Sequence, residues 1–292
     1  MRKIKIILYR LWYTVYCLCH KEPNVVRTDD TLNKLIEDNC SISRFGDGEF
    51  SLMLGKSLPF QKYSEKLKEK LKEVLERETE RHLVAIPNVF GSLEEFSEKS
   101  KAWWKDYLLG NRKKIYSLLP KNRTFYDAQI TRIYINRKDK NQSKERFEKI
   151  KTLWSKKNIL IVEGELSRFG VGNDLFDDCK SVRRILVPPK NAFEKYQKIY
   201  ESTLRMSEKY AIDLILLAIG PTATCLAFDL HNAGKRTLDL GNLDMEYEWM
   251  NQRAESQIAI DGKYTHEAKD GDKNIGDIFD KKYESQIVDR VE

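Results

Sequence analysis

The segment Asp213-Leu-Ile-Leu-Leu-Ala-Ile-Gly-Pro-Thr-Ala-Thr224 joins a buried strand to the start of a helix. Residues 213–219 form a short apolar run rich in branched side chains, which is typical of a strand. The pattern after Gly220 indicates a helix that continues through Asn232. A strand, a glycine loop and a hydroxyl at the helix start form a natural seat for phosphate, and Thr222 is also expected to cap its own helix.

The same alternation of apolar runs and helical patterns extends over the middle of the chain. Apolar residues at helical spacing cover residues 63–78 and 191–210. The runs that predict further strands lie at residues 82–86, 158–162, 184–187 and 236–240. Alternating strands and helices predict an α/β fold with a mainly parallel sheet flanked by helices.

Residues 41–50 read Ser-Ile-Ser-Arg-Phe-Gly-Asp-Gly-Glu-Phe and carry two acids one residue apart. The glycines on either side of Asp47 would allow a tight turn, and Asp47 and Glu49 could then converge on one cation. Mg²⁺ or Mn²⁺ held between these carboxylates and a diphosphate would neutralise the charge that develops as a sugar leaves. For an isolated Asp-x-Glu, an ordinary turn with a solvent-exposed acid is much the commoner explanation, so the motif is weak by itself.

A second strand runs into a glycine-rich loop at residues 158–174. The polar residues at the mouth of this loop are Glu163, Glu165, Arg168 and Asn173. Ligands favour this end of parallel strands. The fork of Arg168 could clamp a phosphate, and Gly170 and Gly172 would let backbone amides approach it. A plain turn is the alternative for a Gly-x-Gly without a third glycine.

Residues 238–249 place acids beside aromatic side chains at the end of a predicted strand. The acids are Asp239, Asp244, Glu246 and Glu248. Sugar sites often combine carboxylates, which bind hydroxyls, with flat apolar faces. One of Asp244, Glu246 and Glu248 could deprotonate an acceptor hydroxyl as general base, and their spacing does not decide which one.

Other kinds of site find little support in the sequence. The four histidines are scattered, and neither a Gly-x-Ser-x-Gly elbow nor a Walker pattern occurs, which argues against a hydrolase triad or a P-loop enzyme. Five cysteines without a CxxC pair suggest neither a disulfide framework nor a zinc cage. The net charge of +7 favours an anionic partner, but the basic residues are interleaved with acids, so we expect no nucleic acid.

Four blocks of this sequence, in this order, resemble the GT-D family of bacterial glycosyltransferases. The blocks are Ser-Arg-Phe-Gly-Asp-Gly-Glu at 43–49, Glu-Gly-Glu-Leu-Ser-Arg-Phe-Gly-Val-Gly-Asn-Asp at 163–174, Gly-Pro-Thr-Ala-Thr at 220–224 and Asp-Leu-Gly-Asn-Leu-Asp-Met-Glu-Tyr-Glu-Trp at 239–249. The resemblance implies a Rossmann-like fold, a UDP-sugar donor and a divalent metal bound through the Asp-x-Glu of Asp47 and Glu49. Two departures are that the family often has a histidine near Asn242, and that Phe169 replaces an expected aliphatic residue.

The residues and the resemblance together predict a metal-dependent glycosyltransferase that moves a hexose, glucose or galactose, from a UDP-sugar to a glycan, glycolipid or glycoprotein acceptor. Asp47 and Glu49 would bind Mn²⁺ or Mg²⁺, while one of the acids Asp244, Glu246 and Glu248 would activate the acceptor. The donor would be bound by Arg44, Gly46, Arg168, Gly170, Gly172, Asn173, Gly220 and Thr222. A nonenzymatic nucleotide- or nucleic-acid-binding protein and a nucleotide-sugar hydrolase are the alternatives.

Composition along the chain predicts three parts. Residues 1–24 combine basic residues with an apolar run too short to span a bilayer, which predicts a packed helix or a peripheral contact with an acidic membrane. Residues 25–250 would form the transferase domain, and the polar residues 251–292 a tail or lid. We therefore expect a cytoplasmic protein, free or attached to the inner face of the plasma membrane through residues 1–24; the oligomeric state is not indicated.

Overall fold

The computed structural model describes residues 21–292 except residues 266, 274 and 278. Most of the predicted N-terminal helix therefore lies outside the described residues, and residues 21–24 are not helical. In the part of the chain that is described, no helix is both long and apolar enough to cross a membrane.

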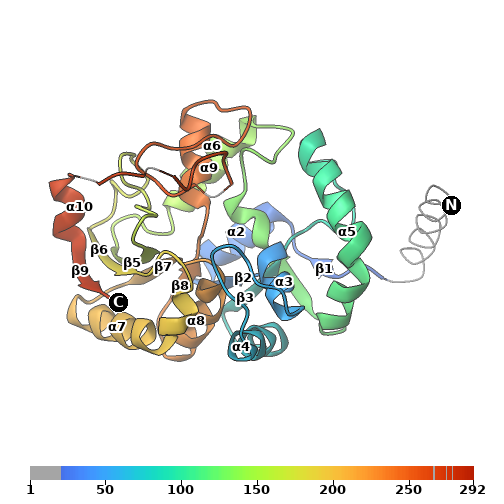
Figure 1. Cartoon of the computed structure of the whole chain (residues 1–292), viewed down its shortest axis with the longest axis horizontal. Helices are drawn as coiled ribbons and strands as arrows, with labels where there is room; N and C mark the ends of the chain where they lie inside the picture. The colour runs from blue at the N-terminus through green and yellow to red at the C-terminus, as the bar shows by residue number, and fades with distance from the viewer. Residues whose placement is uncertain (1–20, 266, 274, 278) are drawn as a thin grey trace.

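One nine-stranded sheet organises the described residues (Figure 1). Its strands are β1 (Asn24–Val25), β2 (Ser41–Arg44), β3 (His82–Ile86), β4 (Thr124–Asp127), β5 (Asn158–Gly164), β6 (Ser181–Val187), β7 (Leu214–Ala218), β8 (Thr237–Asp239) and β9 (Ile287–Arg290). They lie in the order β1-β4-β3-β2-β8-β7-β5-β6-β9, and every neighbouring pair is parallel. The predicted parallel α/β architecture is confirmed.

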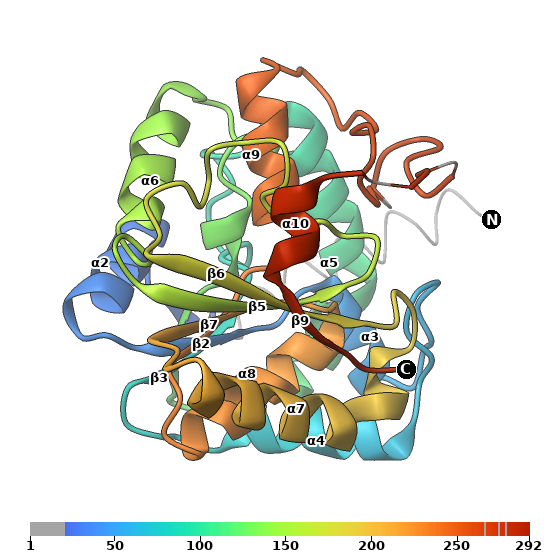
Figure 2. The same cartoon turned by 90° about the vertical axis from the view of Figure 1, so that its left-hand side faces the viewer.

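Helices cover both faces of the sheet (Figure 2). The α-helices are α2 (Thr28–Glu37), α3 (Asp47–Met53), α4 (Glu65–Glu76), α5 (Glu98–Leu118), α6 (Asn141–Lys151), α7 (Tyr196–Lys209), α8 (Pro221–Asn232), α9 (Leu243–Asn251) and α10 (Lys281–Gln286), and the short 3₁₀ helices are η1 (Ala128–Thr131) and η2 (Ala192–Lys195). Helices α2, α6 and α9 pack in the core on one face, and α4, α7 and α8 in the cores on the other. Both faces of the central strands are therefore withdrawn from water.

Alternate side chains of each central strand enter different cores. Ile159 and Ile161 of β5 pack with α2, α6 and α9, whereas Leu160 and Val162 pack with α7 and α8. All four side chains are fully buried. This burial on both faces explains why the strand is a continuous apolar run and does not alternate with polar residues.

The predicted strands and helices are confirmed, with end shifts of up to three residues. Residues 82–86 form β3 without any shift, whereas residues 191–210 begin as η2 before α7 starts. Strands β1, β2, β4 and β9 were not predicted. Strand β2 has Ile42 as its only apolar residue, and its buried serines, Ser41 and Ser43, are hydrogen-bonded instead.

The segment Asp47-Gly48-Glu49 is the first turn of a helix and not the tight loop that its glycines predict. Gly46 is the N-cap of α3, and neither Gly46 nor Gly48 has a positive φ angle. The Gly46 amide donates to Glu49 Oε2 at 2.6 Å, which is the capping-box contact of a helix start. The helix forms because this contact satisfies an amide that would otherwise lack a partner.

The C-terminal residues complete the sheet. Strand β9 pairs with β6 at the edge, and α10 precedes it. The buried ring of Tyr283 lies over the Arg184 guanidinium at 5.0 Å, and Arg184 Nε donates to Gln286 Oε1 at 2.7 Å. The predicted division at residue 250 is therefore not a structural boundary, because a strand of the same sheet lies beyond it.

A chain that ends at residue 279 should be less stable than the full chain. The truncation uncovers the β6 edge and removes the buried side chains of Tyr283 and Val291. Because each such side chain contributes about 1.5–3 kcal/mol, we expect the free energy of unfolding to fall by roughly 3 kcal/mol or more in urea denaturation. Phe279→Ala in the full chain is the control, since Phe279 is 93% exposed. Equal stabilities of the full and shortened chains would show that the tail lies outside the cooperative unit.

Candidate functional site

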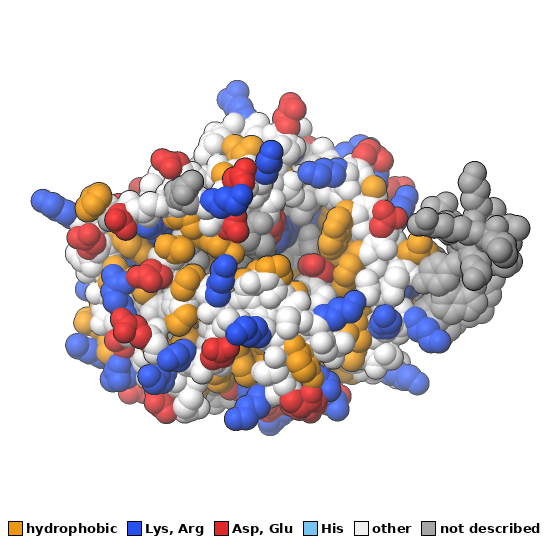
Figure 3. Space-filling model, in the orientation of Figure 1, with side chains coloured by type: hydrophobic (Ala, Val, Ile, Leu, Met, Phe, Trp, Pro, Cys, Tyr) orange, Lys and Arg blue, Asp and Glu red, His pale blue; other side chains and the backbone are white. Residues whose placement is uncertain are grey.

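The four motifs singled out in the sequence follow four strands that lie side by side. These strands are adjacent in the order β2-β8-β7-β5, and because they are parallel their loops leave from one edge. The strands run toward the viewer in Figure 1, and Figure 3 shows a hollow near the centre of this face. From β2 the chain extends the sheet one way through β3 and β4, and later the other way through β5 and β6. Such switch points are where α/β proteins bind ligands.

Arg44, the last residue of β2, joins the loops at the centre of this edge. Its Nε donates to the Asp239 carbonyl at 2.6 Å, and its Nη2 lies 3.0 Å from Asp239 Oδ1 and donates to the Gly241 carbonyl at 3.0 Å. Its Nη1 donates to Thr131 Oγ1 at the end of η1. The guanidinium predicted to contact the donor therefore holds β8 and η1 against β2.

Asp47 and Glu49 lie together at the start of α3, where Asp47 is exposed and Glu49 is half-buried. Burial raises the pKa of Glu49 to about 7; the Gly46 amide opposes this shift, and the charges of Asp239 and Asp47 add to it. The structure therefore gathers three carboxylates where β2 and β8 end. The positive end of the α3 dipole lies at the same point and favours negative charge there.

A divalent cation fits Asp47 and Glu49 as part of a shared coordination shell. Among the described residues no group of three or more His, Cys, Asp or Glu side chains is placed to hold a metal. Mg²⁺ is usually bound by one or two carboxylates while substrate phosphates and waters complete its shell. The crowded negative charge around Glu49 favours a cation. Asp47 and Glu49 thus fit a cation that arrives with phosphate, and not a closed structural site.

The start of α8 reaches the same edge. Gly220 is exposed and is the N-cap of α8 with a φ of +58°, and no described side chain caps this helix. The prediction that Thr222 caps the helix is wrong, because Thr222 is fully buried and its Oγ1 lies 3.4 Å from Gln61 Oε1. A Cβ at Gly220 would lie 3.3 Å from the Phe60 ring. Gly220 is thus the exposed part of the predicted phosphate seat.

The loop after β5 is held by a buried charge pair. Glu163 is fully buried, and its Oε1 pairs with Arg184 Nη1 at 2.6 Å. Gly170 has a φ of +72°, and a Cβ there would lie 2.4 Å from the Phe176 ring, so the turn requires glycine. Gly172 also has a positive φ and is exposed. Of the two predicted glycines, Gly172 presents backbone to solvent.

Arg168, in the same loop, points to the C-terminal segment. Its Nη1 donates to the Gly262 carbonyl at 2.6 Å, and its Nη2 donates to the Gly276 carbonyl at 2.7 Å. The side chain is buried, and its Nε has no hydrogen-bond partner among the described residues. The arginine predicted to clamp a phosphate therefore binds backbone carbonyls of the tail.

Asp244 and Glu248 lie one turn apart on α9 and share two partners. Lys263 Nζ lies 2.7 Å from Asp244 Oδ2 and 3.0 Å from Glu248 Oε1. Asn173 Nδ2 donates to the same two carboxylates at 2.8 and 2.7 Å. The side chain of Asp244 is 4% exposed and that of Glu248 is 13% exposed, so Glu248 is the more accessible acid. Asn173, predicted to contact the donor, orients these two acids.

Glu246 points to the other side of α9. Its Oε2 accepts hydrogen bonds from the amides of Tyr134 and Ile135 at 2.7 and 2.9 Å, and its Oε1 has no partner among the described residues. Burial raises the pKa of Glu246 to about 7, and the charge of Arg132 opposes this shift. The three predicted bases are therefore not equivalent, because Glu246 anchors the loop after η1.

Three charged residues of this edge were missed in the sequence. Both Nη atoms of Arg132, the residue after η1, pair with the carboxylate of Glu267, and Lys263 pairs with the acids of α9. Arg132 gave no signal, because it follows η1 and the short strand β4, neither of which was predicted. Lys263 and Glu267 gave no signal, because they lie in a polar segment without periodicity.

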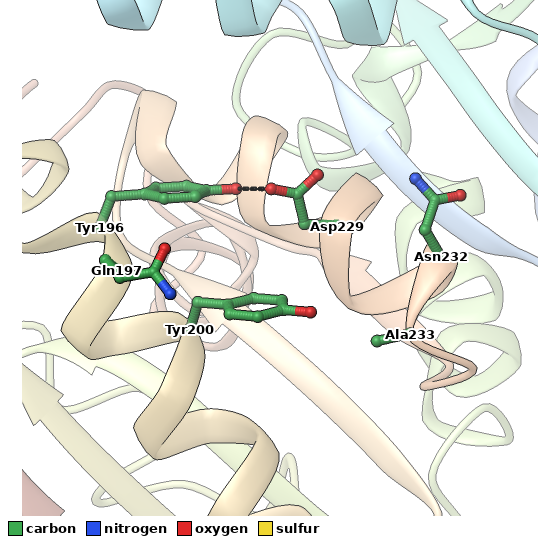
Figure 4. A pocket seen from close by; sticks show the side chains of 6 residues that line it. All are labelled: Tyr196, Gln197, Tyr200, Asp229, Asn232 and Ala233. Atoms are coloured by element: carbon green, nitrogen blue, oxygen red, sulfur yellow. Dashed lines mark hydrogen bonds between the residues drawn. The ribbon is translucent and has the colours of Figure 1, made fainter.

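A separate hollow of about 350 Å³ lies between α7 and α8 (Figure 4). It is lined by Tyr196, Gln197, Tyr200, Asp229, Asn232 and Ala233. Tyr196 Oη donates to Asp229 Oδ2 at 2.7 Å across it. None of the predicted site residues lines this hollow, so it is distinct from the carboxyl edge.

Fold and site together define a parallel α/β protein of the Rossmann type with an acid-rich carboxyl edge. The family described as the glycosyltransferase GT-D fold matches residues 42–268. The chain therefore belongs to the GT-D glycosyltransferase family, and the resemblance of the four sequence blocks is confirmed.

Known relatives agree with this assignment. The glycosyltransferase GlyD of Streptococcus pneumoniae serotype 4 is 38% identical over 265 residues, which cover 90% of this chain and 32% of that protein. The probable glycosyl transferase Gly of Streptococcus gordonii is 38% identical over 269 residues, which cover 92% of this chain and 39% of that protein. The chain thus spans between 32% and 39% of the length of these relatives.

Solved structures show the same fold. A glycosyltransferase of the domain of unknown function 1792 from Streptococcus sanguinis is 36% identical with a TM-score of 0.87, over 93% of this chain and 100% of that one. A second structure, described as a highly conserved domain of unknown function 1792 with a distinct glycosyltransferase fold, has the same identity and TM-score and covers 92% of this chain and 96% of the other. The expected GT-D fold is confirmed.

A neutral histidine lies beneath the site. Ser43 Oγ donates to the Thr224 carbonyl at 2.7 Å, so it accepts from His82 Nε2 at 2.9 Å, which places the ring proton on Nε2. His82 Nδ1 has no hydrogen-bond partner among the described residues. Burial, aided by the charge of His231, lowers the pKa of His82 to about 3. The folded protein therefore resists protonation of this ring.

Acid should destabilise the fold through His82. Because the folded pKa of about 3 lies below the ordinary value of 6.5, the unfolded chain binds the proton first, and stability is lost as the pH falls below that value. Relative to His82→Gln, wild type should lose about 1.4 kcal/mol of unfolding free energy per pH unit between about pH 6 and about pH 4. Urea denaturation of both proteins at each pH measures this difference. It should be constant above about pH 7.5, and parallel profiles throughout would contradict a buried neutral His82.

Proposed function

We propose that the chain transfers a hexose from a UDP-sugar, in a reaction that depends on Mn²⁺ or Mg²⁺, to a glycan, glycolipid or glycoprotein. Glycosyl transfer itself follows from membership of the GT-D family. The observation that carries the proposal is the convergence of the loops after β2, β8, β7 and β5 on one edge. These loops bring two acids, a helix start and a glycine-rich turn to a single switch point.

On the donor side, Asp47 and Glu49 would hold the cation, which when bound neutralises the departing diphosphate. The exposed helix start at Gly220 offers the positive end of the α8 dipole to a phosphate. Gly172 presents exposed backbone at the same edge. Arg44 would position the site and not touch the donor, because its hydrogen-bond donors already hold the loops together. The same applies to the other predicted site residues whose side chains bind within the protein.

On the acceptor side, we assign the general base to Glu248, the most exposed of the three acids of α9. Its carboxylate would take the proton of the acceptor hydroxyl as the new bond to the anomeric carbon forms and the bond to UDP breaks. An acceptor handled at the inner face of the plasma membrane would give the basic residues 1–24 a role in attachment.

Calorimetric titration with UDP tests the donor site and the metal together. Wild type should bind UDP in the presence of Mn²⁺ and lose this binding in EDTA. The double variant Asp47→Asn with Glu49→Gln should bind at least about tenfold more weakly, since charge-assisted contacts contribute roughly 1.5–3 kcal/mol each. Glutamine keeps the acceptor of the capping box, so α3 should remain folded.

The matched control is Glu65→Gln, which removes an exposed acid from the first turn of α4 and should leave UDP binding unchanged. If neither EDTA nor the double variant weakens UDP binding, the assignment of the metal to Asp47 and Glu49 is wrong. A nucleic-acid-binding protein would lose affinity steeply as salt rises, whereas a metal-bridged UDP complex responds chiefly to chelator. A nucleotide-sugar hydrolase would release free sugar from the UDP-sugar without any acceptor.

A further inference from the structure

Arg132 stands on a loop that two site residues hold in place. On one side Arg44 Nη1 donates to Thr131 Oγ1. On the other side the amide of Tyr134 donates to Glu246 Oε2 at 2.7 Å. Arg132 lies between these two anchors, so its guanidinium projects from a fixed backbone at the carboxyl edge.

Carboxylates surround this guanidinium. Burial disfavours its charged form, but the nearby acids outweigh burial and raise the pKa of Arg132. In order of effect these acids are Glu267, Glu246 and Asp47. Arg132 is therefore within electrostatic reach of Asp47, where the proposed cation and diphosphate would lie.

The partner of Arg132 is arranged as a phosphate would be. Both Nη atoms pair with the two oxygens of Glu267, and the two side chains are 21% and 19% exposed. A guanidinium binds carboxylate and phosphate through the same two-pronged geometry. The Glu267 carboxylate therefore lies where two oxygens of a phosphate would lie, and the Arg132 guanidinium would not have to move for one to replace the other.

The segment that carries Glu267 contacts other charged groups of the site. Its Gly262 carbonyl accepts from Arg168 Nη1 at 2.6 Å, and its Lys263 pairs with Asp244 at 2.7 Å. Groups of residues 262–276 thus engage four side chains of the carboxyl edge, those of Arg132, Arg168, Asp244 and Glu248. Displacing Glu267 alone leaves the contacts of Arg168 and Lys263 in place, so this one carboxylate can leave without release of the whole segment.

We infer that Arg132 binds the diphosphate of the donor, and that Glu267 competes for Arg132 when no donor is present. The inference rests on the proposed function. It makes Arg132 a donor-binding residue and Glu267 an internal competitor, so removal of the Glu267 charge strengthens donor binding although no new contact to the donor is made.

The test is calorimetry with UDP and Mn²⁺, and with pyrophosphate and Mn²⁺, on the full chain. Glu267→Gln should bind both about fivefold more tightly than wild type or better, the low end of typical coupling between two sites. Arg132→Gln should bind both roughly tenfold more weakly or worse, because a charged hydrogen-bonding partner is lost. The double variant Arg132→Gln with Glu267→Gln should bind both titrants no more tightly than Arg132→Gln alone, since Glu267 then has no arginine to compete for.

The matched control is Asp270→Asn. Asp270 lies in the same segment and pairs with Lys273 at 2.7 Å, so this change removes one negative charge without touching Arg132. If Glu267→Gln binds no better than Asp270→Asn, or only lowers the melting temperature, the pair is a structural contact and this inference is overturned while the proposed function stands. If wild type binds neither titrant, both are overturned.

Discussion

The contact between Arg44 and Asp239 holds the carboxyl edge together. Strands β2 and β8 share a single register pair, Ile42 with Leu238, so backbone bonds alone fasten them weakly. The Arg44 amide donates to Asp239 Oδ2 at 3.1 Å, while its guanidinium binds both the carboxylate and the carbonyl of the same residue. Their side chains are 12% and 5% exposed, so losing either partner would leave a charge stranded in the interior.

This joint also determines where the acids of the site lie. With β8 held against β2, Asp239 lies near Glu49, and Glu246 of α9 accepts hydrogen bonds from the amides of the loop after η1. The acids are thus positioned by the sheet and by helix starts. The positive charges that face these acids do not all come from the sheet and the helix starts. Lys263 belongs to the C-terminal segment, and a cation at Asp47 would come with the ligand. The proposed function requires this edge to receive positive charge as well as phosphate.

The fold tolerates wide change in sequence. At 36% identity the solved relatives retain a TM-score of 0.87 over more than nine-tenths of this chain. Central strands buried on both faces require apolar side chains of suitable volume, and many sequences satisfy that requirement. Charged residues such as Arg44 and Glu163 should tolerate fewer substitutions, because each is largely shielded from water and paired with a specific partner.

The sequence by itself determined the class of fold and five of the strands, β3, β5, β6, β7 and β8, together with the end of the sheet from which the loops after these strands leave. Continuous apolar runs such as residues 158–162 can be buried on both faces only in a covered parallel sheet, and parallel strands put every following loop on one side. Side-chain direction was decided by tertiary structure. Asp244 and Glu246 are two residues apart on a helix, so they point about 200° apart and find different partners.

Long-range pairing also lay beyond the sequence. Arg132 and Glu267 are separated by 135 residues, and no local pattern relates them. Strand β2 is buried through hydroxyl hydrogen bonds of Ser41 and Ser43, which do not appear in a hydrophobic pattern. The local sequence indicates which residues are buried, because burial depends on the type of side chain. Which charged groups meet depends on how the sheet brings distant loops together, and that is known only once the chain is folded.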